Sequence, residues 1–323
     1  MKLEKLFRLT DTELKSTLCE ELLRHGYEID SITNSHKFLY AEGDTPYMLV
    51  AHLDTVHKNS PSLICYSKDG NYMMSPQGIG GDDRCGVYII LSLLNKLSFK
   101  PYVLFTMDEE IGGLGAKAFI DFIDQCGNQP ELKYIVEYDR KGNKDCVFYN
   151  CDNKDFTEFV EQFGFKTAYG TFTDISVIAP KFGVAAVNLS SGYYNPHTNH
   201  EVVSIFDMKN VIAASINMLT TECDKFEYVA KYVYQSYSSN TYQKRKVSVS
   251  FVPPNSVYIY SYYKKENMPN VAGEVVIDEL GNYYRYNRQF GDISSLSKVE
   301  KIEGAPTVVY NPLAAVTLPV FGY

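Results

Sequence analysis

Several features that mark other classes of protein are missing from this sequence. It has no tryptophan, no CxxC pair, no basic run of five or more residues, and no apolar stretch long enough to span a bilayer. Its formal net charge of -8 argues against a partner recognised through phosphates. The sequence therefore predicts neither a membrane protein nor a nucleic-acid-binding protein.

The sequence also lacks signs of secretion. Its seven cysteines are odd in number and scattered, a pattern typical of reduced thiols and not of a disulfide framework. Residues 1–8 are charged throughout and contain no apolar segment of the kind that signal peptides have. We therefore expect a cytoplasmic protein.

The composition is that of a globular protein large enough for two domains. The 323 residues are 45% hydrophobic and 22% charged. Strand-like and helix-like segments alternate over residues 1–223, whereas residues 224–323 are rich in tyrosine and β-branched residues. We therefore predict an α/β catalytic domain with a mixed, largely parallel sheet and helices on both faces, followed by a small β-rich domain of unknown role.

The periodicity of apolar residues predicts where the elements of each domain lie. In the first domain, strands are predicted at 27–29, 38–41, 47–52, 101–107, 133–136 and 184–188, with a hairpin over 63–74. Helices are predicted at 10–24, 87–97, 115–126, 156–163 and 205–219. In the second domain, strands are predicted at 246–252, 256–263, 274–278, 283–286 and 308–310, with a hairpin turn at 278–282.

Acidic residues and histidines follow several of these predicted strands. In a parallel sheet the carboxyl ends of the strands share one edge, and ligand sites form there. The groups that this topology would bring together are His52, Asp82, Glu109, Glu110, Asp139 and His197. Two imidazoles and several carboxylates suit a divalent ion such as zinc, manganese or cobalt.

Each motif also has an ordinary explanation when it is taken alone. His52 and Asp54 form a short HxD pair in which the carboxylate could accept the second ring N–H of the imidazole. The acidic triplet 108–110 could be a solvated loop. The glycine-rich turn 78–86 could cradle a phosphate, but Asp82 and Asp83 at its tip would repel an anion. Together the motifs favour a metal site.

The order of these motifs resembles that of the co-catalytic zinc exopeptidases. The set is His-x-Asp, Gly-x-Asp-Asp, Asp-Glu-Glu-x-Gly, a strand-terminal Asp and His-x-x-x-Glu, over roughly residues 40–220. That clan includes the aminotripeptidases, the glutamate carboxypeptidases, succinyl-diaminopimelate desuccinylase and the single-domain zinc aminopeptidases. One departure is local, because the Asp-Asp pair directly follows Gly81.

The resemblance implies a role for each matching residue. Two divalent ions would be bound, with zinc expected and cobalt or manganese as alternatives. Asp82 would bridge them, His52 and Asp139 would complete one ion, and Glu110 and His197 would complete the other. Glu109 corresponds to the general base, and Asp54 to the partner of His52.

Other residues near these motifs have weaker assignments. His197 is preferred to His200 because it stands four residues before Glu201, so His200 is predicted at the rim and His57 at the surface. Candidates for a donor to the oxyanion are Tyr193, Tyr194 and Asn195. Arg140 could clamp a substrate carboxylate or pair with a neighbouring acid. The Thr-Asp turn in 170–174 resembles one near the active site in the clan, or is a plain helix cap.

The expected activity is hydrolysis of a peptide bond in a small peptide, by an aminopeptidase or a small-peptide exopeptidase. A deacylase of N-acyl amino acids from the same clan is an alternative, as is a non-catalytic protein that binds through the β-rich domain. The span between Asp139 and His197 is too short for the lid domain that two-domain members insert there. The second domain could also mediate assembly into a homo-oligomer.

Overall fold

The computed structural model describes residues 2–127 and 129–231, together with seven short strands between residues 242 and 319. The chain divides into two compact units, Met1–Lys231 and Tyr232–Tyr323. No helix in the part of the chain that the structure describes is long and apolar enough to cross a membrane.

A mixed sheet of eight strands forms the centre of the first unit. Its order is β1 (Ile32–Asn34), β2 (Phe38–Ala41), β6 (Tyr102–Thr106), β3 (Tyr47–His52), β7 (Tyr134–Arg140), β10 (Ala186–Ser190), β8 (Asp145–Val147) and β9 (Lys166–Thr167). Strands β6, β3, β7 and β10 run parallel to one another. On one side β2 pairs antiparallel with β6 and with β1; on the other β8 pairs antiparallel with β10 and parallel with β9. The parallel centre places four strand ends on one edge.

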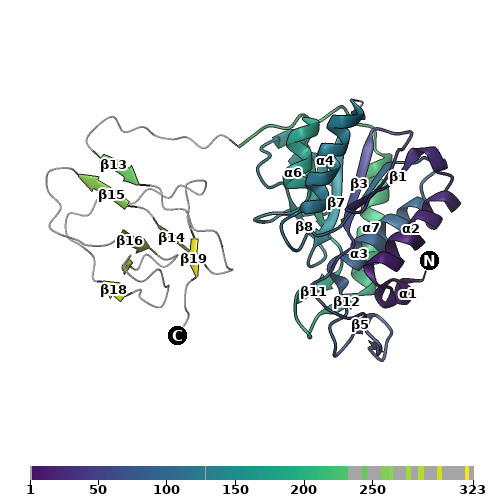
Figure 1. Ribbon diagram of the computed structural model, residues 1–323, viewed down its shortest axis with the longest axis horizontal. Helices are drawn as coiled ribbons and strands as arrows, with labels where there is room; N and C mark the ends of the chain where they lie inside the picture. The colour runs from purple at the N-terminus through teal and green to yellow at the C-terminus, as the bar shows by residue number, and fades with distance from the viewer. Residues whose placement is uncertain are drawn as a thin grey trace. The chain divides into compact units, whose positions relative to one another are not determined.

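Helices cover both faces of this sheet, as predicted (Figure 1). One face packs against α4 (Leu114–Cys126) and α6 (Ile175–Phe182). The other packs against α1 (Leu3–Arg8), α2 (Asp11–Arg24), α3 (Gly81–Leu94), α5 (Lys154–Glu161) and α7 (Ile205–Thr220). Because side chains alternate along a strand, Met48 and Val50 enter the first core and Leu49 and Ala51 the second.

Local sequence explains most of these elements. All six residues of β3 are buried, which fits a strand covered on both faces. Helix α2 begins at a capping box in which the Thr10 side chain accepts from the Glu13 N–H and the Glu13 carboxylate accepts from the Thr10 N–H. Its buried residues Leu14, Leu18 and Leu22 recur every fourth position, on one helix face.

One predicted strand of the first unit is wrong, and helix α6 was missed. The predicted strand at 27–29 gives way to the 3-10 turn η1 (Ile29–Ser31), and the buried Tyr27 hydroxyl donates to the carbonyl of Pro101 at 2.5 Å. Helix α6 was not predicted; it contains Pro180, a residue that argues against a helix from sequence.

A smaller sheet stands beside the central one and carries a long loop. Its four strands are in the order β11 (Tyr193–Tyr194), β12 (Val202–Ser204), β5 (Tyr72–Met74) and β4 (Cys65–Tyr66). The pairing of β4 with β5 confirms the predicted hairpin over 63–74. The loop that joins β11 to β12 holds His197 and Glu201.

The first unit extends beyond the predicted boundary at residue 223. Phe226 packs its ring 5.0 Å from that of Phe156 and 5.1 Å from that of Phe159. Its carbonyl accepts from the Ala185 N–H at 2.8 Å. Residues 224–231 therefore belong with the first unit, and the functional division between the two units stays a prediction.

The described residues of the second unit form strands. β13 (Tyr242–Arg245) pairs with β15 (Ser261–Lys264). A five-stranded sheet has the order β18 (Ser297–Val299), β17 (Tyr283–Tyr286), β16 (Glu274–Ile277), β14 (Ser256–Ile259) and β19 (Thr317–Pro319). This confirms the predicted β-rich character, while the predicted strands 246–252 and 308–310 and the turn 278–282 lie outside the described residues.

Candidate metal centre

The carboxyl ends of β3, β6 and β7 meet at one edge of the central sheet. His52, the last residue of β3, pairs in parallel register with Thr106, the last residue of β6. β7 lies along the other side of β3 and carries Asp139 near its end. Glu109 and Glu110 follow β6 directly, before α4. The topology thus brings the predicted residues of three strands together.

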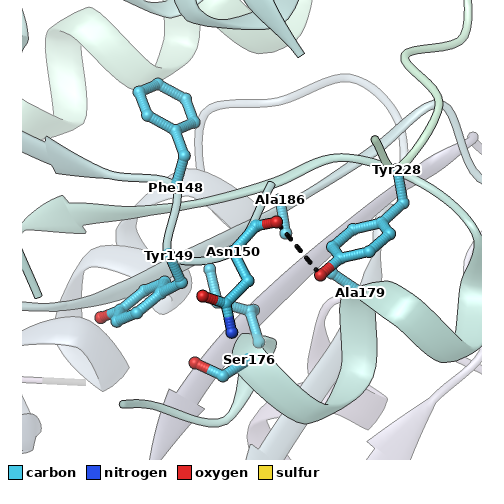
Figure 2. Close-up of a pocket in the computed structure, with 8 residues that line it drawn as sticks. Phe148, Tyr149, Asn150, Ser176, Ala179, Ala186 and Tyr228 are labelled. Atoms are coloured by element: carbon cyan, nitrogen blue, oxygen red, sulfur yellow. Dashed lines mark hydrogen bonds between the residues drawn. The ribbon is translucent and has the colours of Figure 1, made fainter. Parts of the chain in front are cut away.

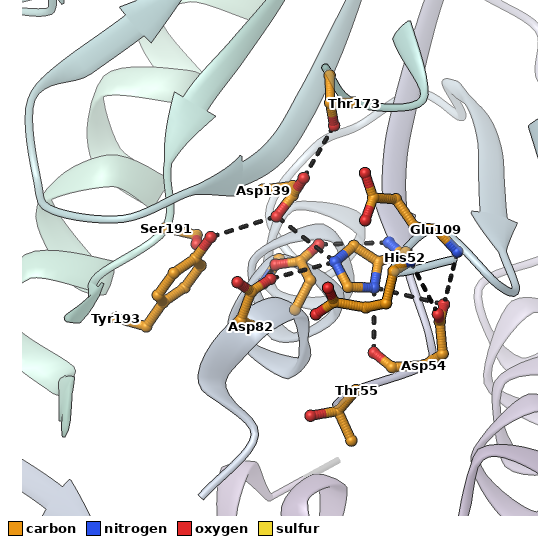
Figure 3. Close-up of polar contacts among 12 residues, drawn as sticks. His52, Asp54, Thr55, Asp82, Glu109, Asp139, Thr173, Ser191 and Tyr193 are labelled. Carbon is orange, nitrogen blue, oxygen red and sulfur yellow. Dashed lines mark hydrogen bonds and ion pairs between the residues drawn. The ribbon is translucent and has the colours of Figure 1, made fainter. Parts of the chain in front are cut away.

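Asp82 lies between the two histidines. It stands at the start of α3, where its φ and ψ of -83° and 100° depart from helical values, and its peptide bond to Asp83 is cis. One carboxylate oxygen, Oδ1, is 3.1 Å from His52 Nε2 (Figure 3). The other, Oδ2, is 3.2 Å from His197 Nε2. Two oxygens that face two different imidazoles are the arrangement that a bridging carboxylate needs.

A second carboxylate accompanies each histidine, so the centre divides into two half-sites that share Asp82. In the inner half-site, Asp139 Oδ1 is 3.5 Å from His52 Nε2. In the outer half-site, Glu110 Oε1 is 3.0 Å from His197 Nε2. The side chain of His52 is 1% exposed and that of His197 is 52% exposed.

Asp54 contacts both His52 and the backbone that carries the acidic pair. Its Oδ1 is 3.5 Å from His52 Nδ1, but the nearest acceptor of that ring nitrogen is the Asp54 main-chain carbonyl at 3.0 Å. The two carboxylate oxygens accept from the N–H groups of Glu109 and Glu110, both at 3.2 Å. Asp54 therefore also fixes the backbone position of Glu109 and Glu110.

Three side chains hold Asp139 in place, and of these Asn188 had no functional assignment from the sequence. Its Oδ2 accepts from the Thr173 hydroxyl at 2.8 Å and its Oδ1 from the Tyr193 hydroxyl at 3.2 Å (Figure 3). The Asn188 side chain accepts from the Asp139 N–H at 2.8 Å and donates to the Asp139 carbonyl at 2.9 Å. Here two residues of β7 oppose one of β10, so the amide replaces ladder bonds lost at a bulge.

Asp83 supports the centre through hydrogen bonds to the backbone. It is fully buried, and its Oδ2 accepts from the His52 N–H at 3.3 Å while its Oδ1 accepts from the Gly86 N–H at 2.9 Å. A Cβ on Gly86 would come 2.4 Å from this carboxylate, so the position requires glycine. The pair of aspartates thus has two roles, one facing the histidines and one bracing the strand end.

Burial and crowding shift the pKa values of the centre in opposite directions. Burial, offset in part by His52, raises the pKa of Glu109 to about 9, and burial with the Asp82 charge raises that of Asp139 to about 6. Burial also acts to raise the pKa of Asp82, but the adjacent imidazoles hold it below its ordinary value. The carboxylates of Asp82 and Glu110 raise the pKa of His197 to about 10. The centre therefore favours added positive charge.

The donor set fits a divalent cation. Among the described residues, two sets of three ligand atoms lie within 4.8 Å of one another, from His52, Asp83 and Asp139 and from His52, Asp82 and Glu110. Glu110 Oε1 is buried and accepts no hydrogen bond from the described residues, although His197 is close. Imidazole with carboxylate is a ligand set that zinc accepts.

The candidates for an oxyanion donor have partners in this structure. The hydroxyl of Tyr193 lies at the centre, on Asp139. That of Tyr194 donates to Asp207 at 2.7 Å, and the side-chain amide of Asn195 donates to the His200 carbonyl at 3.3 Å. Of the three, Tyr193 alone contacts a predicted metal ligand, Asp139, through its side chain.

Three further assignments have definite outcomes. His57 is not a surface residue, because its side chain is 10% exposed and its Nε2 is 3.2 Å from Glu201 Oε2. Arg140 pairs with Asp145 at 3.3 Å, as the ordinary explanation held. The Thr-Asp turn is not a simple cap, since Thr173 donates to Asp139 and the side chain of Asp174 makes no capping hydrogen bond.

A pocket in the first unit lies apart from these groups. It is lined by the segment after β8, by α6 and by Tyr228, whose hydroxyl donates to the Asn150 carbonyl at 3.4 Å (Figure 2). Its lining includes Tyr149 and Ser176 but no acid or imidazole. It therefore lacks the groups that the metal centre offers.

The fold is similar to that of several solved peptidases. A tripeptidase from Staphylococcus aureus shares 13% identity over 67% of this chain and 95% of its own, with a TM-score of 0.53. Aminopeptidase PepT from Bacillus cereus shares 14% over 67% and 95%, also at 0.53. An aminopeptidase from the archaeon Desulfurococcus kamchatkensis shares 17% over 69% and 94%, again at 0.53.

These comparisons confirm the predicted α/β fold with its mixed, largely parallel sheet, which this chain shares with the three peptidases. At such identities they concern the fold and not the reaction. No protein-family model matches the sequence, and no curated protein sequence matches it.

Proposed function

We propose that this protein is a dinuclear metal-dependent hydrolase that removes residues from small peptides. The observation that supports this most directly is the position of Asp82, with one carboxylate oxygen facing each histidine. His52 and Asp139 would complete one ion, and Glu110 and His197 the other. Zinc is the expected metal, with cobalt or manganese as alternatives.

The residues around the ions would position the substrate and move one proton. Two divalent ions, when bound, would acidify a water molecule and stabilise negative charge on the carbonyl oxygen. Glu109 would accept the proton of the attacking water at its carboxylate and pass it to the leaving amine. Asp54 would keep its backbone in place through the hydrogen bond at 3.2 Å.

The charge around the centre favours a substrate with a free amine. Six carboxyl groups stand close to the two histidines: Asp54, Asp82, Asp83, Glu109, Glu110 and Asp139. The two arginines adjacent in sequence to the predicted ligands are engaged, Arg84 with Asp11 at 2.5 Å and Arg140 with Asp145 at 3.3 Å. An ammonium group is therefore favoured over a free carboxylate, which supports an aminopeptidase over a deacylase.

Metal content and substrate choice test this proposal together. Protein equilibrated with zinc should retain close to two ions per chain by elemental mass spectrometry. It should hydrolyse aminoacyl amides and tripeptides faster than N-acyl amino acids. Folded protein that retains no ion would overturn the proposal, and a preference for N-acyl substrates would move it to the deacylase alternative.

The general base has its own test. Glu109→Gln should retain both ions but lose at least about 100-fold in kcat, the size expected for a positioned base. Near-wild-type kcat in this variant would show that another group accepts the proton. Cytoplasmic location and self-association stay predictions.

A further inference from the structure

Glu201 is a buried carboxylate on the same loop as His197, and it contacts a different part of the centre. It is 0% exposed. Its Oε1 accepts from the Asp82 N–H and its Oε2 from the Gly80 N–H, both at 2.9 Å. Hydrogen bonds between a carboxylate and backbone N–H groups are short and strong. The loop that carries His197 is therefore fastened to the turn that carries Asp82.

A third segment joins this contact. His57, five residues after His52, places its Nε2 at 3.2 Å from Glu201 Oε2. Its ring also fills the space beside Gly78, where a Cβ would come 2.1 Å from the imidazole. Glu201 thus connects the segment after β3, the start of α3 and the loop between β11 and β12. The second carries Asp82, the third carries His197, and the first directly follows His52.

The turn and the loop approach too closely to tolerate a larger residue. A Cβ on Gly81 would lie 2.8 Å from Val203 Cγ2 and 3.1 Å from Glu201 Oε1. Gly80 has φ +71°, a conformation that glycine adopts readily. Glycine at both positions allows the backbone N–H groups to reach the carboxylate.

The outer half-site depends on this fastening more than the inner one does. His52 is placed by a strand with neighbours on both sides, and Asp139 by three side chains of its own. His197 has φ +62°, lies in a loop, and is 52% exposed. The position of the His197 loop relative to Asp82 therefore rests largely on Glu201.

We propose that Glu201 is a positioning residue that sets the affinity of the outer half-site. It touches neither the substrate nor the ions. It holds the Asp82 backbone and the His197 loop at the spacing at which both can ligate one ion. This inference rests on the proposed dinuclear function, and it adds that the two ions depend differently on one carboxylate.

Competition with a chelator tests the proposal in Glu201→Gln. The substitution keeps the size of the side chain but replaces one of its two acceptor oxygens by an NH2 group. That group cannot accept a hydrogen bond from a backbone N–H. We expect one ion to stay tight and the other to be released at least about tenfold more easily, the range typical for partners outside the ligand shell. Glu201→Gln that holds both ions like the wild type would overturn the proposal, as would equal weakening of both.

Asp207→Asn is the matched control. Asp207 is also a buried carboxylate, 8% exposed, and it accepts from Tyr194 and Asn143 without touching the Asp82 turn. This variant should keep two tight ions, and selective loss of one in it would contradict a specific role of Glu201. Thermal melting of both variants establishes that each is folded.

A second variant decides the matter if Glu201→Gln does not fold. Glu201→Asp keeps the charge but is too short to reach both N–H groups, so the same selective loss is expected. Wild-type affinity for both ions in Glu201→Asp would show that the negative charge alone suffices. That result would overturn the proposed positioning role of Glu201. Wild-type protein that binds no ion would instead overturn the proposed dinuclear function, and the positioning role of Glu201 with it.

Discussion

The inner and outer half-sites use the same donors, one imidazole and one carboxylate beside the shared Asp82, but they are built on different parts of the fold. His52 and Asp139 belong to neighbouring strands in the middle of the sheet. Glu110 follows a strand, and His197 lies in a loop of the smaller sheet. The His52 side chain is 1% exposed and the His197 side chain 52%.

This difference separates two tasks within one centre. The inner half-site is rigid because strand ladders and the braces on Asp139 fix its groups before any ion arrives. The outer half-site is open to water at His197, and the proposed contact through Glu201 would hold that histidine in place. The following predictions test whether the two halves differ in this way.

Loss of Asp82 should have the largest effect on metal affinity, because both half-sites share this residue. Asp82→Asn removes the charge that faces both imidazoles. We expect both ions to weaken by more than about 100-fold, beyond the range for partners outside the ligand shell. Chelator competition measures this, and an Asp82→Asn protein that keeps one ion at wild-type affinity would show that Asp82 serves one half only.

Removal of His52 and removal of His197 should lower the free energy of unfolding by different amounts. In the metal-free protein, His52→Ala removes the buried imidazole that faces both Asp82 and Asp139, which should cost about 3–5 kcal/mol. His197→Ala removes an exposed partner and should cost about 0–1 kcal/mol. Urea unfolding of metal-free protein compares the two, and equal losses would mean that the halves are equally rigid.

His197 of the outer half-site and Glu109, which precedes Glu110, should give the metal-free protein a distinct pH dependence. His197 has a pKa of about 10 when folded against a reference of 6.5, and Glu109 about 9 against 4.5. Both folded values are raised, so folding takes up protons, and this stability is present at low pH and lost as pH rises. We expect the melting temperature to fall between about pH 4.5 and 10.

Single variants and bound metal provide the controls for this pH effect. Glu109→Gln should flatten the acidic part of the profile, and His197→Gln the part above neutral pH. Zinc should remove most of the dependence, because the cations take the place of the protons. A metal-free melting temperature that rises across this window would contradict both assignments.

The smallest expected effect concerns a brace of the inner half-site. Tyr193→Phe removes the hydroxyl that lies 3.2 Å from Asp139 Oδ1 and leaves the Thr173 and Asn188 contacts intact. We expect the inner ion to weaken about tenfold and the outer ion to be unaffected. If kcat falls strongly while both affinities hold, Tyr193 acts on the oxyanion and not on Asp139.

Much of the candidate centre could be predicted because its signals are local. A buried apolar run followed by a histidine or acid marks a strand end, and the alternation of strands with helices fixes a parallel centre. His52, Asp82 and Asp139 were identified on that basis, and the structure places an oxygen of each aspartate within 3.5 Å of His52 Nε2. Their roles as ligands stay predictions until metal binding is measured.

The sequence alone thus determined which residue types gather at the sheet edge, since strand periodicity and chain order are properties of neighbouring residues. The tertiary structure decided how those residues are held. Asn188 meets Asp139 across 49 positions, and Glu201 meets Asp82 across 119. Such contacts depend on strand register, a bulge and the seating of one loop on another. No local pattern encodes these, because each is set by packing between segments distant in the chain.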